Sequence, residues 1–265
     1  MPKFSFSSIP PFIRKTHSRG QSFLELALIL PILIILLLGV VEVTFFIGRY
    51  LDLLDLTREA ARFASVRDPF EVLAGDPNRW DEKCGTSNRY DFFFDTSCVF
   101  APRGIPSTNC TFCNGLNDLA KLDLSTDDVM IRVFTISGKP QADEEGNVVT
   151  VPYVSDTWPS SGPWVLSNHD DDTAHNNNWT RDCDGAPLSS PTPYFTPERV
   201  NEDMYKDGTS NYLKGFVSVE LYYCYRQVLN LPIFTIFVPN PMRIHVYTFM
   251  PLPAAQPTQT ATSAP

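Results

Sequence analysis

The candidate residues for proteolytic processing and for charge pairing lie where a basic leader meets a long apolar run. Gly20 ends the leader, Gln21 follows it, and Glu25 stands within the apolar run. A charged side chain at the centre of a membrane helix costs on the order of 2.5 to 3.5 kcal/mol, and less near the interface, so this carboxylate calls for a partner. Two interpretations are open. Glu25 reaches the lipid headgroups, or proteolysis after Gly20 frees an α-amino group on Gln21 and Glu25 meets such a cation on a neighbouring subunit.

The segment that positions these residues is long and apolar enough to cross a membrane. Phe23 to Ile47 is almost purely apolar, and as a helix rising ~1.5 Å per residue it would span about 37 Å, more than the roughly 30 Å of a hydrocarbon core. The leader from Met1 to Gly20 contains basic but no acidic residues, which places the N-terminus in the cytoplasm by the positive-inside rule. A cleaved secretory signal has a shorter apolar region, of roughly 7 to 15 residues, so we expect an uncleaved anchor rather than a removed signal peptide.

Three further residues within the apolar run are candidates for helix packing: Pro31, Gly39 and Glu42. Pro31 removes a backbone donor and is expected to kink or loosen the helix locally, although many membrane helices tolerate proline without any role. Glu42 is expected to lie at the outer membrane face, and a buried contact between helices is the alternative.

The helix is expected to continue beyond the membrane as an amphipathic extension. Its apolar stripe is expected to contain Leu53, Leu54, Thr57, Ala60, Ala61 and Ala64, at helical spacing. Asp68-Pro69 should end the helix, because the residue before a proline is disfavoured in the helical region. One helix of about 45 residues would therefore offer a single stripe on which an outer domain can pack.

The outer region of the sequence is rich in strand patterns. The expected strands are Val129 to Ser137, Asn147 to Tyr153, Phe216 to Tyr225 and Ile244 to Phe249, and the polar stretch Gly138 to Gly146 is expected to connect the first two as a hairpin. In the third strand Val217, Val219, Leu221, Tyr223 and Tyr225 share one face, while Ser218 and Glu220 alternate with them, which predicts a half-exposed strand. The fold class is therefore α+β, with an antiparallel sheet packed on the outer half of the helix in a pilin-like arrangement.

Two segments of this outer region have their own composition. Ser155 to Tyr212 is rich in Pro, Asp, Asn and Ser, and we expect an irregular insertion pinned by Cys183 and by tryptophans. The expected division of the chain is a basic cytoplasmic leader at 1–20, a long helix at 21–67 (transmembrane at about 23–47), an extracytoplasmic α+β domain at 68–250 with its insertion at about 155–212, and a disordered Pro/Thr-rich tail at 251–265.

All six cysteines follow the membrane segment, and the candidates for disulfides are Cys84, Cys98, Cys110, Cys113, Cys183 and Cys224. An even number outside the membrane suggests up to three bridges, whose pairing the sequence leaves open. The spacing of Cys110 and Cys113 could also form half of a zinc site. No second such pair or histidine at ligand spacing accompanies it, so disulfides are favoured.

Composition and motifs argue against nucleic-acid binding and against catalysis. The chain carries 21 basic and 30 acidic residues, a net charge of −9, so no broad basic surface is available for a phosphate backbone. It contains no G-x-S-x-G, H-E-x-x-H or phosphate-binding glycine loop. The acidic stretches His169 to His175 and Asp143 to Asn147 lack the ligand register of a calcium loop. We therefore expect no catalytic residue, no metal and no cofactor.

Arg19 to Ser65 resembles the N-terminal module of the TadE-like pseudopilins of the tight-adherence (Flp) pilus machinery. The residues that carry the resemblance are Gly20, Glu25, the Ala-Leu run into Pro31, Gly39 with Glu42, and the helical ending Arg58-Glu59-Ala60-Ala61-Arg62. The resemblance implies that Gly20 and Gln21 flank the bond cut by a prepilin peptidase and that Glu25 is the carboxylate used in processing and assembly. Leu26 departs from the family pattern, in which an aromatic residue often follows the glutamate.

The resemblance also implies a function and a set of partners. The function would be that of a minor pseudopilin in the assembly of a Tad/Flp-type pilus or a related secretion apparatus. The partners would be the lipid bilayer, the prepilin peptidase, other Tad pilus subunits and inner-membrane platform proteins. The protein would lie in the cytoplasmic membrane as a single-pass protein with its C-terminal domain outside.

Two alternatives come from other function classes. The first is a single-pass anchored protein whose extracellular domain binds a partner and never enters a filament. The second, an anchored extracellular enzyme, would require a constellation of polar residues in the Ser155 to Tyr212 insertion that the sequence does not display.

Overall fold

The computed structural model describes residues 21–70, 92–100, 122–123, 125–142, 145–168, 177–206, 215–235 and 238–253. The chain divides into two compact units, Met1–Val43 and Thr44–Pro265, each described by itself. Helix α1, Gln21–Ser65, contributes its N-terminal half to one unit and its C-terminal half to the other.

The two halves of α1 differ in what their side chains contact. In the N-terminal half nearly every apolar side chain is exposed, which is typical of a helix that is hydrophobic all round. In the C-terminal half a single stripe is buried, and its members are Leu53, Leu56, Thr57, Ala60, Ala61 and Ala64. The predicted stripe is thus confirmed except at one position, since Leu56 is fully buried and Leu54 only half-buried.

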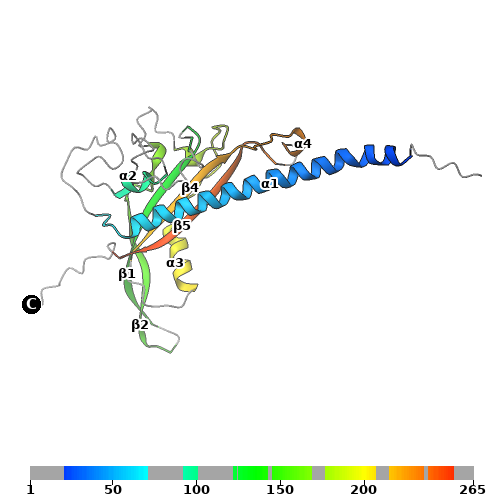
Figure 1. Ribbon diagram of the computed structural model, residues 1–265. Helices are drawn as coiled ribbons and strands as arrows, with labels where there is room; N and C mark the ends of the chain where they lie inside the picture. The colour runs from blue at the N-terminus through cyan, green and yellow to red at the C-terminus, as the bar shows by residue number, and fades with distance from the viewer. Residues whose placement is uncertain are drawn as a thin grey trace, which may run out of the picture. The chain divides into compact units, whose positions relative to one another are not determined.

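The second unit contains an antiparallel sheet, so the α+β class is confirmed (Figure 1). Its strands are β1 (Asp128–Ala142), β2 (Val148–Trp158), β4 (Gly215–Tyr225) and β5 (Met242–Leu252), in the order β2-β1-β4-β5. The short strand β3 (Trp164–Val165) also pairs with β1. Beyond Phe134, β1 pairs with β2 alone, so the two continue as a ribbon past the rest of the sheet.

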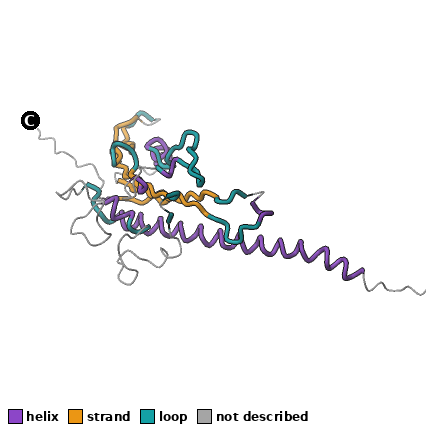
Figure 2. The backbone as a smooth tube through the Cα atoms, turned by 90° about the horizontal axis from the view of Figure 1, so that it is seen from above, coloured by secondary structure: helices purple, strands orange, loops and turns teal. Residues whose placement is uncertain are grey.

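One surface of the sheet, here called the helix face, packs on the C-terminal half of α1 (Figure 2). Its central side chains are Val129, Ile131, Val133, Val217, Val219, Leu221 and Val246, all at most 2% exposed. The predicted face of the third strand is therefore confirmed. The alanines of α1 let the strands approach closely, and Thr248 Oγ1 donates a hydrogen bond to Thr57 Oγ1 at 3.3 Å.

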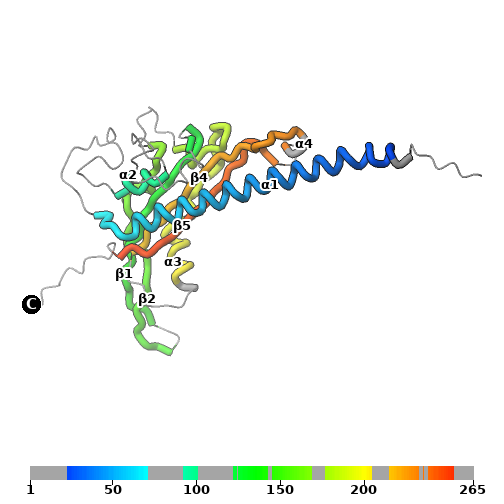
Figure 3. The backbone as a smooth tube through the Cα atoms, viewed as in Figure 1, coloured from blue at the N-terminus to red at the C-terminus, as the bar shows by residue number. Residues whose placement is uncertain are grey.

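The other surface, here called the insertion face, is covered by the chain between β2 and β4. Helix α3 (Pro197–Lys206) lies beside β2 (Figure 3). From it, Val200 and Met204 pack with Phe195 against Phe134, Ile136 and Phe216 of the sheet. The prediction that Ser218 and Glu220 leave this strand half exposed is wrong, because both are buried beneath that layer, at 2% and 1% exposed.

Three other boundaries differ from the sequence-based expectation. β1 continues to Ala142, so most of the predicted polar connection is strand, and β2 begins at Val148 and extends past the predicted end at Tyr153 to Trp158. The insertion is regular in places, with β3, the 3₁₀ turns Leu166–Asn168 and Asn178–Thr180, and α3. β5 includes Pro251 and Leu252, and Leu252 is fully buried, so the tail begins later than predicted. Short helices α2 (Phe92–Ser97) and α4 (Pro232–Thr235) complete the described elements.

Candidate functional site

The predicted processing and assembly residues lie at the start of α1. Gln21 is the first residue of the helix, and Gly20 lies outside the described residues. Glu25 is one turn into the helix, and its side chain is exposed. α1 is long and apolar enough to cross a membrane from Phe23 onward, the only such helix among the described residues. An apolar helix with a carboxylate near its first turn is therefore in place.

The three helix-packing candidates are spread along the same helix. α1 continues without interruption through Pro31, whose side chain is exposed, and Gly39 is half-buried. Glu42 is 8% exposed. Glu25 and Glu42 are separated by a rise of about 25 Å along the helix, so these two carboxylates form two sites and not one.

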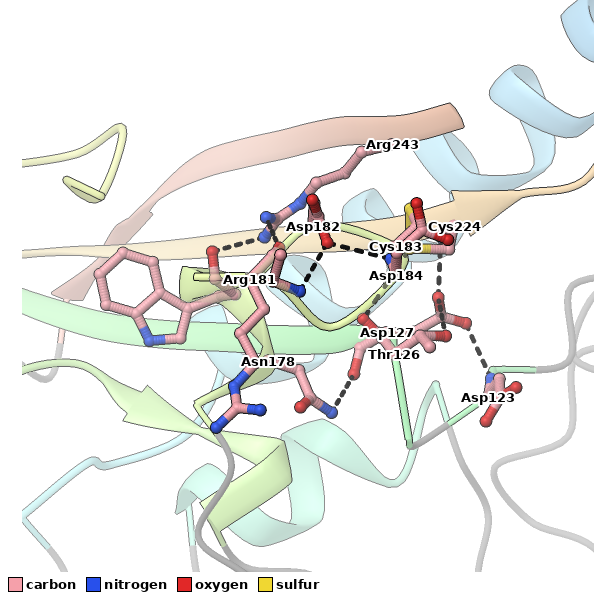
Figure 4. The surroundings of a disulfide bond; sticks show 12 residues. Asp123, Thr126, Asp127, Asn178, Arg181, Asp182, Cys183, Asp184, Cys224 and Arg243 are labelled. Atoms are coloured by element: carbon pink, nitrogen blue, oxygen red, sulfur yellow. Dashed lines mark hydrogen bonds between the residues drawn. A yellow bond between two sulfur atoms is a disulfide. The ribbon is translucent and has the colours of Figure 1, made fainter. Parts of the chain in front are cut away.

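One disulfide joins the insertion to the sheet: Cys183 bonds to Cys224 near the end of β4 (Figure 4). This confirms that Cys183 pins the insertion. Arg243 of β5 adds to the junction, because its guanidinium donates hydrogen bonds to the backbone oxygens of Arg181 and Trp179. Cys98 is buried and also disulfide-bonded, whereas the other three candidates, Cys84, Cys110 and Cys113, lie outside the described residues.

Two adjacent buried carboxylates at the start of β1 organise the chain around this disulfide. Asp127 accepts hydrogen bonds from the backbone N–H of Cys224 at 2.7 Å and of Asp123 at 2.8 Å. Asp128 accepts from the backbone N–H groups of Ser167 at 3.0 Å and Trp179 at 2.9 Å, and from Ser167 Oγ at 2.9 Å. Burial raises the pKa of each carboxyl to about 6 despite these hydrogen bonds.

A third buried carboxylate, Glu220, holds the covering layer on the insertion face. It accepts hydrogen bonds from the backbone N–H of Tyr194 at 3.1 Å and of Phe195 at 3.1 Å, and from Tyr222 Oη at 2.8 Å, and it lies 3.0 Å from His245 Nε2. Burial raises the pKa of Glu220, but the hydrogen bonds outweigh it and hold that pKa below its ordinary value. Glu220 thus fixes the loop at Tyr194 and Phe195 on strand β4.

A cleft of about 450 Å³ lies between the C-terminal half of α1 and the end of β4. Its lining includes Arg49 and Asp52 of the helix, Asp127, Tyr223 of β4, and Arg226, which directly follows β4. Among the described residues, Arg49 Nη1 is buried without a hydrogen-bond partner. The same portion of the chain holds no group of three or more His, Cys, Asp or Glu side chains placed to bind a metal ion.

The region that matches a known family is helix α1 and not the sheet or its insertion. Residues 20–62 match the family model of the TadE-like proteins. The resemblance is thereby confirmed over this segment. No curated protein and no solved structure matches the chain.

The match divides the candidate residues into two sets. The TadE-like segment contains Gly20, Gln21, Glu25 and the three helix-packing candidates, as well as Ala60 and Ala61, which pack on the sheet. The cysteines, the three buried carboxylates and all strands lie beyond it. Helix α1 thus carries a recognisable family pattern, whereas the strands and the insertion do not.

Sequence reasoning missed the three buried carboxylates. Asp127 and Asp128 directly precede an apolar strand, and Glu220 stands alone among apolar and aromatic residues of another. An isolated carboxylate in an otherwise apolar strand is a signal of a buried, hydrogen-bonded group when both faces of the sheet are covered. The sequence pattern of α3, which covers the second face, was not recognised.

Proposed function

We propose that this chain is a TadE-like minor pseudopilin that takes part in assembling a Tad/Flp-type pilus or a related secretion apparatus. The observation that carries the proposal is the TadE-like match over residues 20–62, which spans the predicted cleavage site, Glu25 and the apolar helix. In this proposal α1 anchors the chain in the cytoplasmic membrane with its N-terminus inside and its sheet domain outside. The anchor follows from length and apolarity, and the orientation follows from the basic leader.

The proposed mechanism places Glu25 at the centre of assembly. A prepilin peptidase cuts between Gly20 and Gln21, which creates a new α-amino group at the start of α1. Glu25 of one subunit then neutralises the amino terminus of an adjacent one, and contacts between helices replace contacts with lipid. Pro31 and Gly39 lie within the surface that this lateral packing would use.

The proposal gives the outer domain a binding role and no catalytic step. Its buried carboxylates accept hydrogen bonds from backbone N–H groups and neighbouring side chains, which is an arrangement that positions loops. A rigid sheet packed on the C-terminal half of α1 presents surfaces to other pilus subunits and to inner-membrane platform proteins. These partners belong to the proposal.

The decisive measurement is the mature N-terminus of the membrane-extracted protein from its native host, by intact mass and N-terminal peptide mapping. A start at Gln21 is the expected result, because processing of this kind removes the leader and exposes that residue. A start at Met1 or Pro2 would refute prepilin-type processing and leave a membrane-anchored relative.

Replacing Glu25 tests the assembly step. Glu25→Ala should leave membrane insertion intact and reduce co-purification with other pilus components at least tenfold, since a lost pairing of about 1.4 kcal/mol corresponds to that factor. Glu59→Ala is the matched control, because Glu59 is an exposed glutamate of the same helix outside the apolar run. Equal co-purification of the two variants would contradict the proposed role of Glu25.

A second candidate function is that of an anchored extracellular binding protein that never enters a filament. It is favoured by one observation: the family match ends at residue 62 and leaves the strands and the insertion without a match. It predicts an intact leader and indifference to Glu25→Ala, so the same two measurements separate the candidates.

A further inference from the structure

The connection between β4 and β5 has an unusual composition for a loop. It covers residues 226–241, of which 226–235 and 238–241 are described. From Gln227 to Pro241 the sequence contains no Asp, Glu, Lys or Arg and is rich in Val, Leu, Ile and Phe. Val228 is 58% exposed and Val238 is 38% exposed. Loops at a protein surface usually carry polar side chains, so an exposed apolar loop is typical of a surface that contacts a membrane or another protein.

The direction of this loop follows from contacts between the sheet and the C-terminal half of α1. Thr57 contacts Thr248, which pairs with Val219 of β4. Farther along the same strand, Tyr225 meets Phe46 edge to face, with ring centroids 5.4 Å apart. The helix rises about 17 Å from Thr57 back to Phe46, and the strand advances about 20 Å from Val219 to Tyr225. β4 thus runs from Thr57 toward Phe46 of α1, and the loop begins next to Phe46.

That position coincides with the end of the membrane segment. Phe46 and Ile47 are the last residues of the apolar run that begins at Phe23. The strand ladder closes at the pair Tyr225 and Met242, so the residues between them project past the sheet. α4 lies at the tip of this hairpin in Figure 1.

Several described polar groups of the loop are bonded to one another, although Gln227 Oε1 is buried without a hydrogen-bond partner in the described part of the chain. Gln227 N–H donates to Asn240 Oδ1 at 3.0 Å, and Gln227 Nε2 donates to the backbone oxygen of Val238 at 3.3 Å. Asn240 Nδ2 donates to Asn230 Oδ1 at 2.7 Å, and Thr235 donates from its backbone N–H to Leu231 and from Oγ1 to Pro232. Internal bonding of this kind lowers the cost of entering a medium that offers no hydrogen bonds.

We propose that the β4–β5 loop is a second membrane contact, which inserts apolar side chains, among them Val228 and Val238, into the outer leaflet beside the end of the apolar run at Phe46 and Ile47. The proposal rests on the membrane anchoring of α1 in the proposed function. We infer contact with the lipid bilayer because the loop begins beside the end of the apolar run, where Tyr225 meets Phe46, and because it has no charged residue from Gln227 to Pro241. Arg49 and Arg226 at its base lie beside Asp52 and Asp127, so the contact depends on apolar insertion and not on attraction to anionic lipid.

A membrane-dipping loop would fix the outer domain as well as anchor it. A single helix leaves a domain free to rotate above the bilayer, whereas two contacts define one orientation. For a subunit that must meet its neighbours laterally, this presents the same surface of the sheet to each of them before assembly.

The test uses the full chain reconstituted in phosphatidylcholine vesicles, with and without phosphatidylcholine brominated near the headgroup end of its acyl chains. Bromine quenches tryptophan on contact, and tryptophan is well tolerated at membrane interfaces. The variants are Val228→Trp and Val238→Trp. The matched control is Val148→Trp, because Val148 is 77% exposed in the β1–β2 ribbon away from this loop. In each variant the signal of the parent's own tryptophans is subtracted.

The expected result is that the brominated vesicles quench most of the added fluorescence of Val228→Trp and Val238→Trp and leave that of Val148→Trp unchanged. Equal quenching at the three positions would overturn the proposal, as would a blue-shifted but unquenched signal, which indicates that a second copy covers the loop. Vesicle flotation separates failure of the loop contact from failure of the helix anchor. A chain that floats without quenching refutes the loop contact alone, and a chain that does not float refutes the anchor and the loop together. Quenching in a protein whose leader is intact in its host keeps the loop contact and refutes the pilus assignment.

Discussion

The helix face of the sheet is buried by one continuous element, whereas the insertion face is buried by several short pieces of the chain between β2 and β4. On the helix face, alanines and leucines of α1 meet valines and isoleucines of the strands. On the insertion face, α3 and the segment around Phe195 are short, and two buried acids, Glu220 and Asp128, tie their surroundings to the sheet.

The difference concerns the kind of interaction that each face depends on. Apolar packing is non-directional, and its contribution grows with the area removed from water. Buried carboxylates contribute only when their hydrogen bonds are complete, and losing one partner leaves a desolvated group behind. The helix face should therefore be sensitive to volume, and the insertion face should be sensitive to single polar atoms and to the disulfide.

The largest effect is expected from removing the disulfide. In Cys183→Ser/Cys224→Ser, the 41-residue separation of the two cysteines predicts a loss of about 4 kcal/mol in the free energy of unfolding, since the bridge restricts the unfolded chain. Urea unfolding of the detergent-solubilised chain measures this loss. Hydrogen exchange should rise more at Phe195 to Met204 than at Leu53 to Ala64, because the bridge holds the covering layer of the insertion face.

Ala186→Ser is the control for that variant, since Ala186 is exposed in the same short loop as Cys183. It should unfold at the parent's urea concentration. If the double serine variant exchanged faster to an equal degree on both faces, the two faces would be one cooperative unit and the comparison would fail.

The sequence predicted the helix face better than the insertion face, for a physical reason. Apolar residues at helical spacing in α1 and at alternate positions in β4 report directly which side is buried, and Leu53, Ala60 and Val219 were placed correctly. The burial of Glu220 depends on a layer that comes from a distant segment of the chain. Local periodicity carries no information on such a layer. For the same reason Glu25, Pro31, Gly39 and Glu42 could be placed on one helix, but the sequence does not identify what their side chains contact.

Replacing Glu220 should give the next largest effect. Glu220→Gln keeps the size of the side chain but offers one acceptor oxygen where the carboxylate has two, so it turns an N–H group toward donors that now lack a partner. We expect a loss of about 3 kcal/mol in the free energy of unfolding, typical of a buried polar network that loses one member. Glu202→Gln is the control, because Glu202 lies on the exposed side of α3. A loss below about 1 kcal/mol would show that these donors find other acceptors.

The same variant predicts a change in pH dependence. The pKa of Glu220 in the folded chain lies below its ordinary value of 4.5, so its ionised form contributes stability above pH 4.5 that is lost as the pH falls through the folded-state pKa. Asp127 and Asp128 act in the opposite sense: their pKa values near 6 make the folded chain gain stability as the pH falls from about 6 toward 3.8. Both are present in parent and variant, so the difference between the two urea profiles isolates Glu220 and should shrink below pH 4.5. A difference that stays constant down to pH 3 would contradict this assignment.

The smallest effect is expected from added volume, and it should differ between the faces. Ala61→Leu places a larger side chain where α1 packs closely on the sheet, and Ala61 is fully buried, so overpacking should cost about 2 kcal/mol. Val200→Leu adds one methylene on α3, which is a helix of 10 residues. A short helix can shift outward by a fraction of an ångström, so the cost there should stay below about 1 kcal/mol.

Arg62→Leu controls for the apolar substitution itself, because Arg62 is an exposed neighbour of Ala61 on α1. Val200→Leu adds one carbon and Ala61→Leu adds three, so an equal loss for the two variants in urea unfolding would mean that the insertion face is packed at least as tightly as the helix face. The hydrogen bonds from Tyr194 and Phe195 to Glu220 would then hold the segment before α3 as firmly as apolar packing holds α1 on the other face.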